Sequence, residues 1–167
     1  MAPMPGSVSS VWTHRLQLLT FACSFVLAIC TILQGWMVIN PETVELSLRL
    51  AGRTAAETAA EAPGLLTECR MVTAYYLVGN ALGMFALRGS AWSFWAALVV
   101  NLTQAGSPLG LIPAGVYRAA LQSYGPVGLF PTMVIGGGAI VLIIALISGI
   151  VPFREIWADI RAAHTNG

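Results

Sequence analysis

The side chains of this chain that could bind or transform a ligand lie in segments that are otherwise apolar. Their amides could hydrogen-bond an uncharged group, their guanidinium could hold a polar head group, and their carboxyl and phenol groups could exchange protons. The candidate ligand-binding residues are Gln34, Arg70, Asn80, Asn101 and Gln104, and the candidate catalytic residues are Glu68, Tyr75 and Tyr76. Such a set is compatible with acid–base chemistry of the isomerase or cyclase type, which needs no metal and no nucleotide.

Helical periodicity places most of these residues on one face of each of three expected helices. At about 100° per residue, each helix carries one stripe of polar or small residues. The stripes are Thr20, Cys23, Cys30 and Gln34; Arg70, Thr73, Tyr76 and Asn80; and Ser90, Ser93, Ala97, Asn101 and Gln104. Because polar residues avoid lipid, we expect the stripes to meet inside a bundle and to form a pocket in its outer half. The alternative is that they only hydrogen-bond neighbouring helices and form no site.

The elements that would position these residues follow from the distribution of charge. Eight arginines, seven acidic residues and no lysine leave four long uncharged segments, residues 16–41, 71–87, 89–117 and 119–153. A bilayer core is about 30 Å thick and takes roughly 20 helical residues to cross. We therefore predict an all-α fold, an integral membrane four-helix bundle formed by a single domain over residues 1–167. The expected transmembrane helices are about 16–39, 67–88, 91–112 and 129–151. The helices of a soluble bundle would need polar faces that these segments lack.

One sizeable loop, residues 41–65, is expected outside the membrane. Asn40 and Pro41 can end the first helix and begin another, with Asn40 as the N-cap. The next apolar residues alternate with polar ones, a period typical of a strand. They are Val44, Leu46, Leu48 and Leu50.

Three short helices are expected beside the spans. Thr54 and Glu57 match a capping box, which predicts a short helix that Pro63-Gly64 would end. Residues 113–124 are predicted to form a helix along the membrane surface. Residues 153–161 are amphipathic and are predicted to form a C-terminal interfacial helix.

Both termini are predicted to be cytoplasmic. If the four predicted spans alternate in direction, each side of the membrane carries four arginines, so the positive-inside rule discriminates little. We expect Arg70 to lie partly in the membrane, which favours the side that holds the termini.

Several classes of protein are disfavoured by what the sequence lacks. The only histidines, His14 and His164, lie near the ends, which argues against histidine-ligated metal sites. The net charge of +1 offers no field for nucleic acid, and no phosphate-binding loop or dinucleotide fingerprint occurs. We therefore predict no metal, no cofactor and no nucleic acid partner. The expected partners are membrane lipid and a lipophilic small molecule, with another membrane protein or a second copy of the chain as alternatives.

The order of elements resembles that of a known group of proteins. An apolar helix is followed by Asn40-Pro41, a loop, Glu68-x-Arg70 at the start of the second helix, and then glycine-rich helices. Over residues 16–150 this layout resembles DoxX-like and related small four-helix membrane proteins. The resemblance implies a four-helix bundle and no particular functional residue.

Three functions are compatible with these observations. The first is binding, with or without transformation, of a lipophilic small molecule or lipid in the predicted pocket. The second is that of a non-catalytic accessory subunit, which would contact a larger membrane complex through Gly79, Gly83 and the long loop. The third is that of a small oligomeric transporter, although no acidic residue lies deep within a predicted span to couple transport to protons. A co-purified ligand, a second polypeptide or flux in liposomes, respectively, would distinguish them.

Overall fold

The computed structural model describes residues 14–106 and 111–165, with side chains as far as Gly149. Over these residues the chain is all-helical and contains no strand, so the predicted all-α class is confirmed. Two stretches, His14–Val38 and Ala114–Gly149, are long and apolar enough to cross a membrane. The elements in chain order are α2 (His14–Ile32), η1 (Leu33–Val38), α3 (Pro41–Leu50), α4 (Ala55–Met84), η2 (Phe85–Arg88), α5 (Ala91–Gly106), α6 (Ala114–Tyr124), η4 (Gly125–Leu129) and α7 (Phe130–Thr165).

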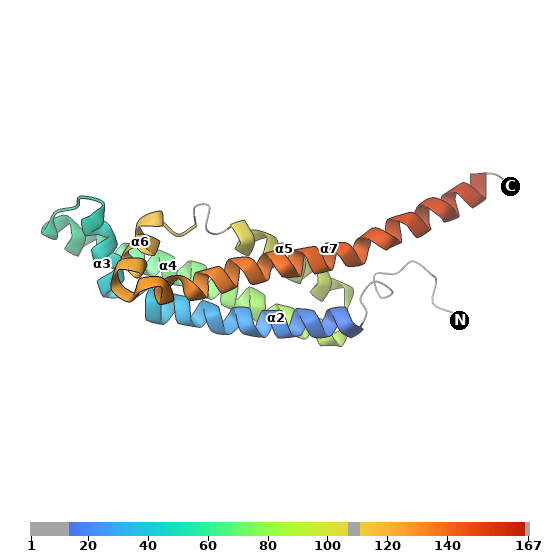
Figure 1. Ribbon diagram of the computed structural model, residues 1–167, viewed down its shortest axis with the longest axis horizontal. Helices are drawn as coiled ribbons and strands as arrows, with labels where there is room; N and C mark the ends of the chain where they lie inside the picture. The colour runs from blue at the N-terminus through green and yellow to red at the C-terminus, as the bar shows by residue number, and fades with distance from the viewer. Residues whose placement is uncertain (1–13, 107–110, 166–167) are drawn as a thin grey trace.

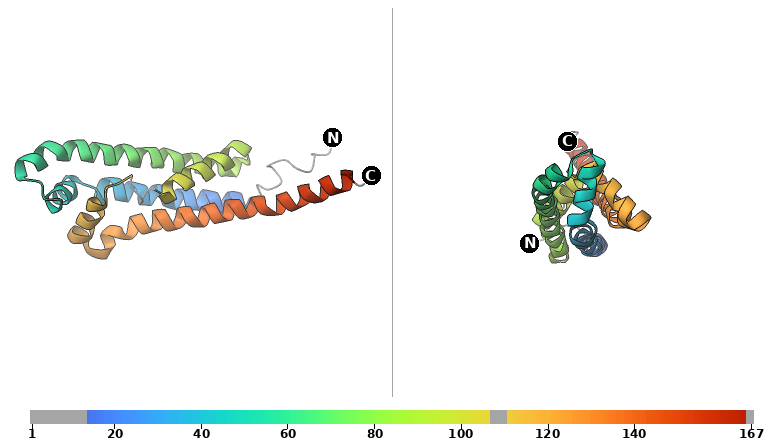
Figure 2. Two further views of the ribbon diagram at one scale, coloured as in Figure 1. Left: turned by 90° about the horizontal axis from the view of Figure 1, so that it is seen from above. Right: turned by 90° about the vertical axis from the view of Figure 1, so that its left-hand side faces the viewer.

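The long helices α2, α4, α5 and α7 run side by side along the molecule (Figure 1). Helix α2 packs against α4 and α7, and α5 packs against the same two helices, so the four form a closed bundle. The short helices α3 and α6 pack on each other at one end of it. The start of α2 and the end of α7 both lie toward the opposite end (Figure 1 and the left view of Figure 2).

The apolar core is divided into separate clusters, between which the helices also bury polar residues. One cluster joins η2, α5 and α7 and contains Ala86, Phe94, Ala97, Leu98, Leu142 and Leu146. A second joins α3, α4 and α6 and contains Ile39, Val44, Ala62, Cys69, Ile112 and Val116. A third, smaller cluster of Leu27, Cys30 and Ile135 joins α2 to α7. Buried polar side chains fill the rest of the interior.

The segment whose apolar residues alternate like those of a strand is the helix α3. Asn40 is its N-cap, with Oδ1 accepting a hydrogen bond from the Thr43 backbone N–H at 2.9 Å, and Pro41 is its first residue. The predicted start at Asn40-Pro41 is therefore confirmed, whereas the strand-like interpretation is wrong. A lone strand would leave its backbone groups unpaired, while a helix pairs them internally. Helix α3 instead buries Val44 and Ser47, which lie on one helical face.

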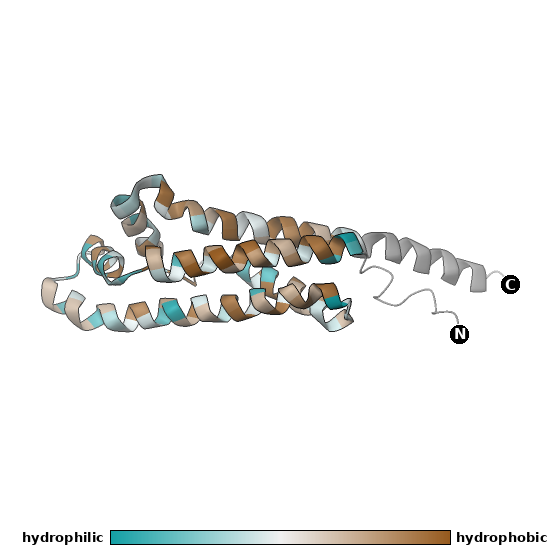
Figure 3. Cartoon of the chain, turned by 90° about the horizontal axis from the view of Figure 1, so that it is seen from below, coloured by the Kyte–Doolittle hydropathy of each residue, from teal (hydrophilic) through white to brown (hydrophobic). Residues whose placement is uncertain are grey.

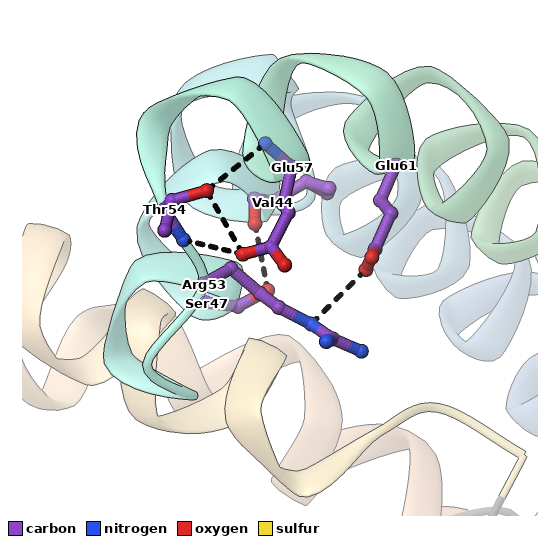
Figure 4. A network of polar contacts seen from close by, with 6 residues as sticks. All are labelled: Val44, Ser47, Arg53, Thr54, Glu57 and Glu61. Atoms are coloured by element: carbon purple, nitrogen blue, oxygen red, sulfur yellow. Dashed lines mark hydrogen bonds and ion pairs between the residues drawn. The ribbon is translucent and has the colours of Figure 1, made fainter.

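Helix α4 begins at the predicted capping box. The Thr54 backbone N–H donates to the Glu57 carboxylate at 2.8 Å, and the Glu57 N–H donates to Thr54 Oγ1 at 3.3 Å (Figure 4). Arg53 forms an ion pair with Glu61 at 3.3 Å, one turn further along the helix. The hydrogen bonds from the Thr54 backbone and hydroxyl, with the nearby charge of Arg53, lower the pKa of the Glu57 carboxyl.

The predicted stop at Pro63-Gly64 is wrong, because α4 continues through Pro63 as far as Met84. A proline inside a helix removes one backbone hydrogen bond and crowds the preceding turn, which costs about 3 kcal/mol. Ala62 and Cys69 lie on either side of this point and are both buried in the cluster shared with α3 and α6. Their packing holds the two halves of α4 in line. The predicted loop over residues 41–65 is therefore mostly helical.

The remaining bounds agree with the sequence in part. The predicted helix over residues 113–124 is confirmed as α6, and α5 ends at Gly106 rather than near residue 112. The predicted C-terminal helix over residues 153–161 is not a separate element, because α7 runs without a break to Thr165. Its amphipathic side chains lie outside the described part of the chain.

Candidate functional site: a polar cavity inside the bundle

A small cavity lies where η1, α4, α5, α6 and α7 approach one another. Its volume is about 20 Å³, which is enough for one water-sized group. Its wall is unusually polar for the interior of so apolar a chain. It is lined by Thr31, Gln34, Val72, Thr73, Tyr76, Gln104, Ile112, Tyr117, Thr132 and Ile135.

Gln104 is the most informative residue of this wall. Its side chain is 0% exposed, yet neither Nε2 nor Oε1 has a hydrogen-bond partner among the described residues. A buried polar group left unpaired costs about 1–3 kcal/mol. The residue lies in the last turn of α5, which positions its side chain beside α4 and α6. The cavity therefore presents an amide whose NH2 group and carbonyl oxygen are both without a partner among the described residues.

Gln34 faces the cavity because the helix changes its winding at this point. After Ile32 the chain passes from the α-helix α2 into the π-helix η1, Leu33–Val38. Such a wider turn re-aims the side chains that follow it and is frequent at functional sites. Gln34 is buried, and its side-chain amide lies in the cavity wall with Tyr117 of α6. Unlike the Gln104 amide, the Gln34 amide is not among the buried polar groups that lack a partner in the described residues.

Tyr76 forms the cavity wall on the side of α4 and α5. Its ring is 5% exposed, and its hydroxyl donates a hydrogen bond to the backbone carbonyl of Thr103 at 3.0 Å. That carbonyl lies in the last turn of α5, where backbone carbonyls lack a partner within the helix. The bond therefore satisfies a buried acceptor and fixes the tyrosine against α5.

Asn80 and Asn101 are buried inside the bundle but do not line the cavity. Asn80 Nδ2 donates to the hydroxyl of Thr31 at 3.4 Å, and Thr31 is part of the cavity wall. Asn101 Nδ2 donates to the carbonyl of Ala97 in its own helix at 2.7 Å. Both residues are 1% exposed, and each has a side-chain oxygen with no partner among the described residues. They extend the polar interior of the bundle beyond the cavity.

Three of the predicted site residues lie on the outer surface of α4, away from the cavity. Glu68, Arg70 and Tyr75 are exposed, so the expected polar pocket is built without Arg70 or Glu68. The reason lies in the seam of α4, which is buried at intervals of seven residues through Ala62, Cys69, Tyr76 and Gly83. Cys69 takes the inward position next to Arg70, because burying an unpaired guanidinium is far more costly than burying a thiol.

The structure adds cavity residues that the polar stripes do not include. Thr31 and Thr132 are hydroxyl residues that resemble ordinary helix-packing threonines in the sequence. Tyr117 reaches the cavity because α6 folds over the end of the bundle. A signal for this packing is present in α6, since Val116, Ala119 and Ala120 share one helical face and are all buried.

The paired glycines of α4 are occupied inside the molecule. A β-carbon at Gly79 would lie 2.6 Å from the Val100 side chain of α5, and one at Gly83 would overlap the hydroxyl of Ser24 in α2. These glycines allow α4 to approach two neighbours closely. They are therefore not available as the contact surface that the accessory-subunit hypothesis assigned to them.

Comparison of the chain with models of protein families, with curated proteins and with solved structures found no match. The resemblance to DoxX-like proteins therefore stays a prediction from the order of elements. The function of the chain is inferred below from the geometry of its own residues.

Proposed function

We propose that this chain is a multi-pass integral membrane protein that binds a lipophilic molecule through an uncharged polar group of that molecule. In this proposal α2, α4, α5 and α7 cross the bilayer as a four-helix bundle, with both termini in the cytoplasm. The polar group of the ligand occupies the cavity beside Gln104. The observation that carries the proposal is the fully buried, unpaired amide of that residue.

The distribution of apolar side chains supports a membrane location. Large apolar residues are exposed on all four long helices, whereas the interior contains amides and hydroxyls. Hydrophobic residues predominate along the long helices in Figure 3. Soluble monomers rarely expose continuous apolar surface on this scale, while lipid covers it without cost. Examples are Phe25 and Ile29 of α2, Met71 and Val78 of α4, Trp95 and Val99 of α5, and Val141 and Ile144 of α7.

The position of the charged residues supports the same conclusion. Arg15 lies at the start of α2, and Arg88 ends η2 beside it, where Gly89 approaches Gln17. Arg70 precedes an uncharged segment of residues 71–87. At 1.5 Å per residue this segment spans about 25 Å, close to the thickness of a bilayer core. The acidic and basic residues of α3 and of the first turns of α4 gather at the opposite end. Each end is therefore charged and the band between is not.

The chemistry of the cavity favours a neutral ligand group. Gln104 offers an amide hydrogen and a carbonyl oxygen side by side, and Tyr76 and Thr73 add hydroxyls. Among the described residues that line it, none is a carboxylate, a histidine, an arginine or a cysteine. A charged head group would thus meet no opposite charge. The acid–base role considered for Glu68 and Tyr75 lacks support, since both are exposed, and we propose binding rather than transformation.

The test is native mass spectrometry of the protein extracted in mild detergent, followed by solvent extraction of whatever is bound. We expect a specific lipophile to accompany the wild type and the Gln122→Leu variant, which changes an exposed glutamine of α6. The Gln104→Leu variant should lose it while its unfolding temperature stays equal or rises, because an unpaired amide has been removed.

Either of two results would contradict this function. One is a wild-type protein that carries no lipophile, and the other is a Gln104→Leu variant that retains the same ligand. A second polypeptide in place of the ligand would instead favour the role of an accessory subunit.

The proposed topology has its own test. In a variant whose cysteines are replaced by alanine, Ala91→Cys and Ser123→Cys place single thiols at exposed positions near opposite ends of the bundle. A membrane-impermeant maleimide added outside intact cells should label Cys at position 123 and not at position 91. Equal labelling of both would refute the arrangement.

A further inference from the structure

The outer surface of the bundle carries an apolar groove directly behind the wall of the polar cavity. The groove lies between α4 and the end of α5, is open to the outside, and has a volume of about 400 Å³. It is lined by Met71, Val72, Tyr75, Tyr76, Thr103 and Leu111. Met71 and Tyr75 are 62% and 56% exposed, so they form its outer rim.

The groove and the cavity share a wall. Val72 and Tyr76 line both spaces, and the hydrogen bond from Tyr76 ends on Thr103, which belongs to the groove. The side chain of Tyr76 therefore separates the apolar surface from the unpaired amide of Gln104. A change of its rotamer that gives up one hydrogen bond would join the two spaces.

We propose that the ligand is a lipophilic alcohol whose hydrocarbon chain lies in this groove and whose hydroxyl reaches Gln104 past Tyr76. This proposal rests on the function proposed above and adds the chemical class and the route. A hydroxyl group is both a donor and an acceptor, so one oxygen can accept from Nε2 and donate to Oε1 of Gln104. It is also small enough for a cavity of about 20 Å³. In the proposed topology Met71, at the rim of the groove, faces the lipid. The hydrocarbon chain of the alcohol therefore enters the groove sideways from the bilayer.

A second groove provides an internal control. It lies between η1 and the start of α7, has a volume of about 420 Å³, and is lined by Leu33, Met37, Val38, Tyr124, Val127, Gly128, Phe130 and Pro131. Its size and apolar character resemble those of the first groove. It shares no lining residue with the cavity. Met37, at 64% exposed, corresponds closely to Met71 in residue type and exposure.

The experiment uses the full chain in phosphatidylcholine nanodiscs with a hexadecan-1-ol that carries a photoreactive diazirine at the middle of its chain. After irradiation, labelled residues are mapped by mass spectrometry of the peptides. We expect labelling at Met71, Tyr75 or Thr103. Labelling there should fall about tenfold, a loss of about 1.4 kcal/mol of binding, in Gln104→Leu and in Met71→Trp. Met37→Trp should label like the wild type, and the matching diazirine hexadecane, which lacks the hydroxyl, should not label the groove preferentially.

The outcomes separate this inference from the proposed function. Labelling that depends on Gln104 but falls on Met37 or Phe130 would show that the hydrocarbon chain does not lie in the first groove. The cavity would then remain the site of the polar group. Labelling of the first groove that is equal for the alcohol and the hydrocarbon, or unchanged in Gln104→Leu, would overturn the alcohol and its route. A wild type that is not labelled above the level of the hydrocarbon would do the same, whereas the proposed function fails only if native mass spectrometry finds no lipophile that depends on Gln104. Because Met71 and Met37 are exposed, unfolding temperatures of the two tryptophan variants should match, which shows that any difference arises from the groove.

Discussion

Gly35 of η1 lies directly against the side chain of Thr73 of α4. A β-carbon at residue 35 would overlap both the methyl group and the hydroxyl of the threonine. The hydroxyl of Thr73 is itself directed to the carbonyl of Cys69 at 2.8 Å, which leaves the side chain little freedom to move away. This contact sets how closely η1 approaches α4, and with it the position of the neighbouring Gln34 at the cavity.

We expect Gly35→Ala to destabilise the bundle by about 1–3 kcal/mol, the usual cost of forcing extra volume into a packed interior. The matched control is Gly64→Ala, because Gly64 is also helical but has no atom within 4 Å of its added β-carbon. That variant should be stabilised by roughly 0.5–1 kcal/mol through the helix propensity of alanine. Thermal unfolding of both variants in the same detergent measures the difference. Equal unfolding temperatures would contradict the close contact.

Much of the interior could be predicted from the sequence, because side chains that cannot face lipid must face one another. The prediction that the polar stripes are buried is confirmed for Thr20, Gln34, Asn80 and Gln104. Helical spacing alone located these residues, since one face of each helix carries them. The same reasoning failed at Arg70, which lies about 60° from Thr73 around the helix and turns outward.

Other features depend on contacts that the sequence does not encode locally. Helix α4 continues through Pro63 because it packs against α3 and α6 in a shared apolar cluster. These contacts exist only in the folded protein. The place of Tyr117 in the cavity depends on the way α6 crosses the end of the bundle. No residue pattern around Gln34 predicts its π-helical turn. In each case tertiary packing outweighs local preference.

The contact between α4 and α5 at Gly79 predicts energetic coupling. Gly79→Ala should be destabilising, because its β-carbon would lie 2.6 Å from Cγ1 of Val100. Val100→Ala opens space at the same point, so the double variant should be less destabilised than the sum of the two single variants by at least about 0.5 kcal/mol. Unfolding of the four proteins of this cycle gives the coupling energy. Strict additivity would show that the two residues do not touch.

The capping box predicts a local effect at the start of α4. Thr54→Ala removes the acceptor of the Glu57 backbone N–H and should weaken the first turn by about 1 kcal/mol, equivalent to a roughly fivefold larger equilibrium constant for opening. Hydrogen–deuterium exchange of a peptide that covers residues 54–62 reports this opening directly. Thr67→Ala changes an exposed threonine further along α4 and should leave that peptide unchanged. If Thr54→Ala lowered the global unfolding temperature but left the exchange of residues 54–62 unchanged, this would argue against the cap.

The lowered pKa of Glu57 predicts how this cap depends on pH. Since the pKa is lower in the folded protein than the value of about 4.3 in an unfolded chain, the ionised carboxylate stabilises the first turn above that value. The stabilisation is lost as the pH falls through the folded pKa. The exchange rate of residues 54–62 in Glu57→Gln relative to the wild type should therefore be constant above about pH 5.5 and approach one in acid. A ratio that does not change with pH would show that the charge of Glu57 has no part in the cap.

The adjacent tyrosines of α4 test the wall between groove and cavity. Tyr76 donates its hydroxyl to the Thr103 carbonyl at 3.0 Å, whereas the hydroxyl of Tyr75 has no hydrogen-bond partner among the described residues. Tyr76→Phe should therefore destabilise the protein by about 0.5–1.5 kcal/mol, and Tyr75→Phe should leave the unfolding temperature unchanged. Because the phenylalanine at position 76 is no longer tied to α5, its ring can turn more freely. We therefore expect Tyr76→Phe to exchange a bound lipophile faster than the wild type while retaining Gln104-dependent binding. Equal exchange rates in the two single variants would mean that Tyr76 does not control access to the cavity.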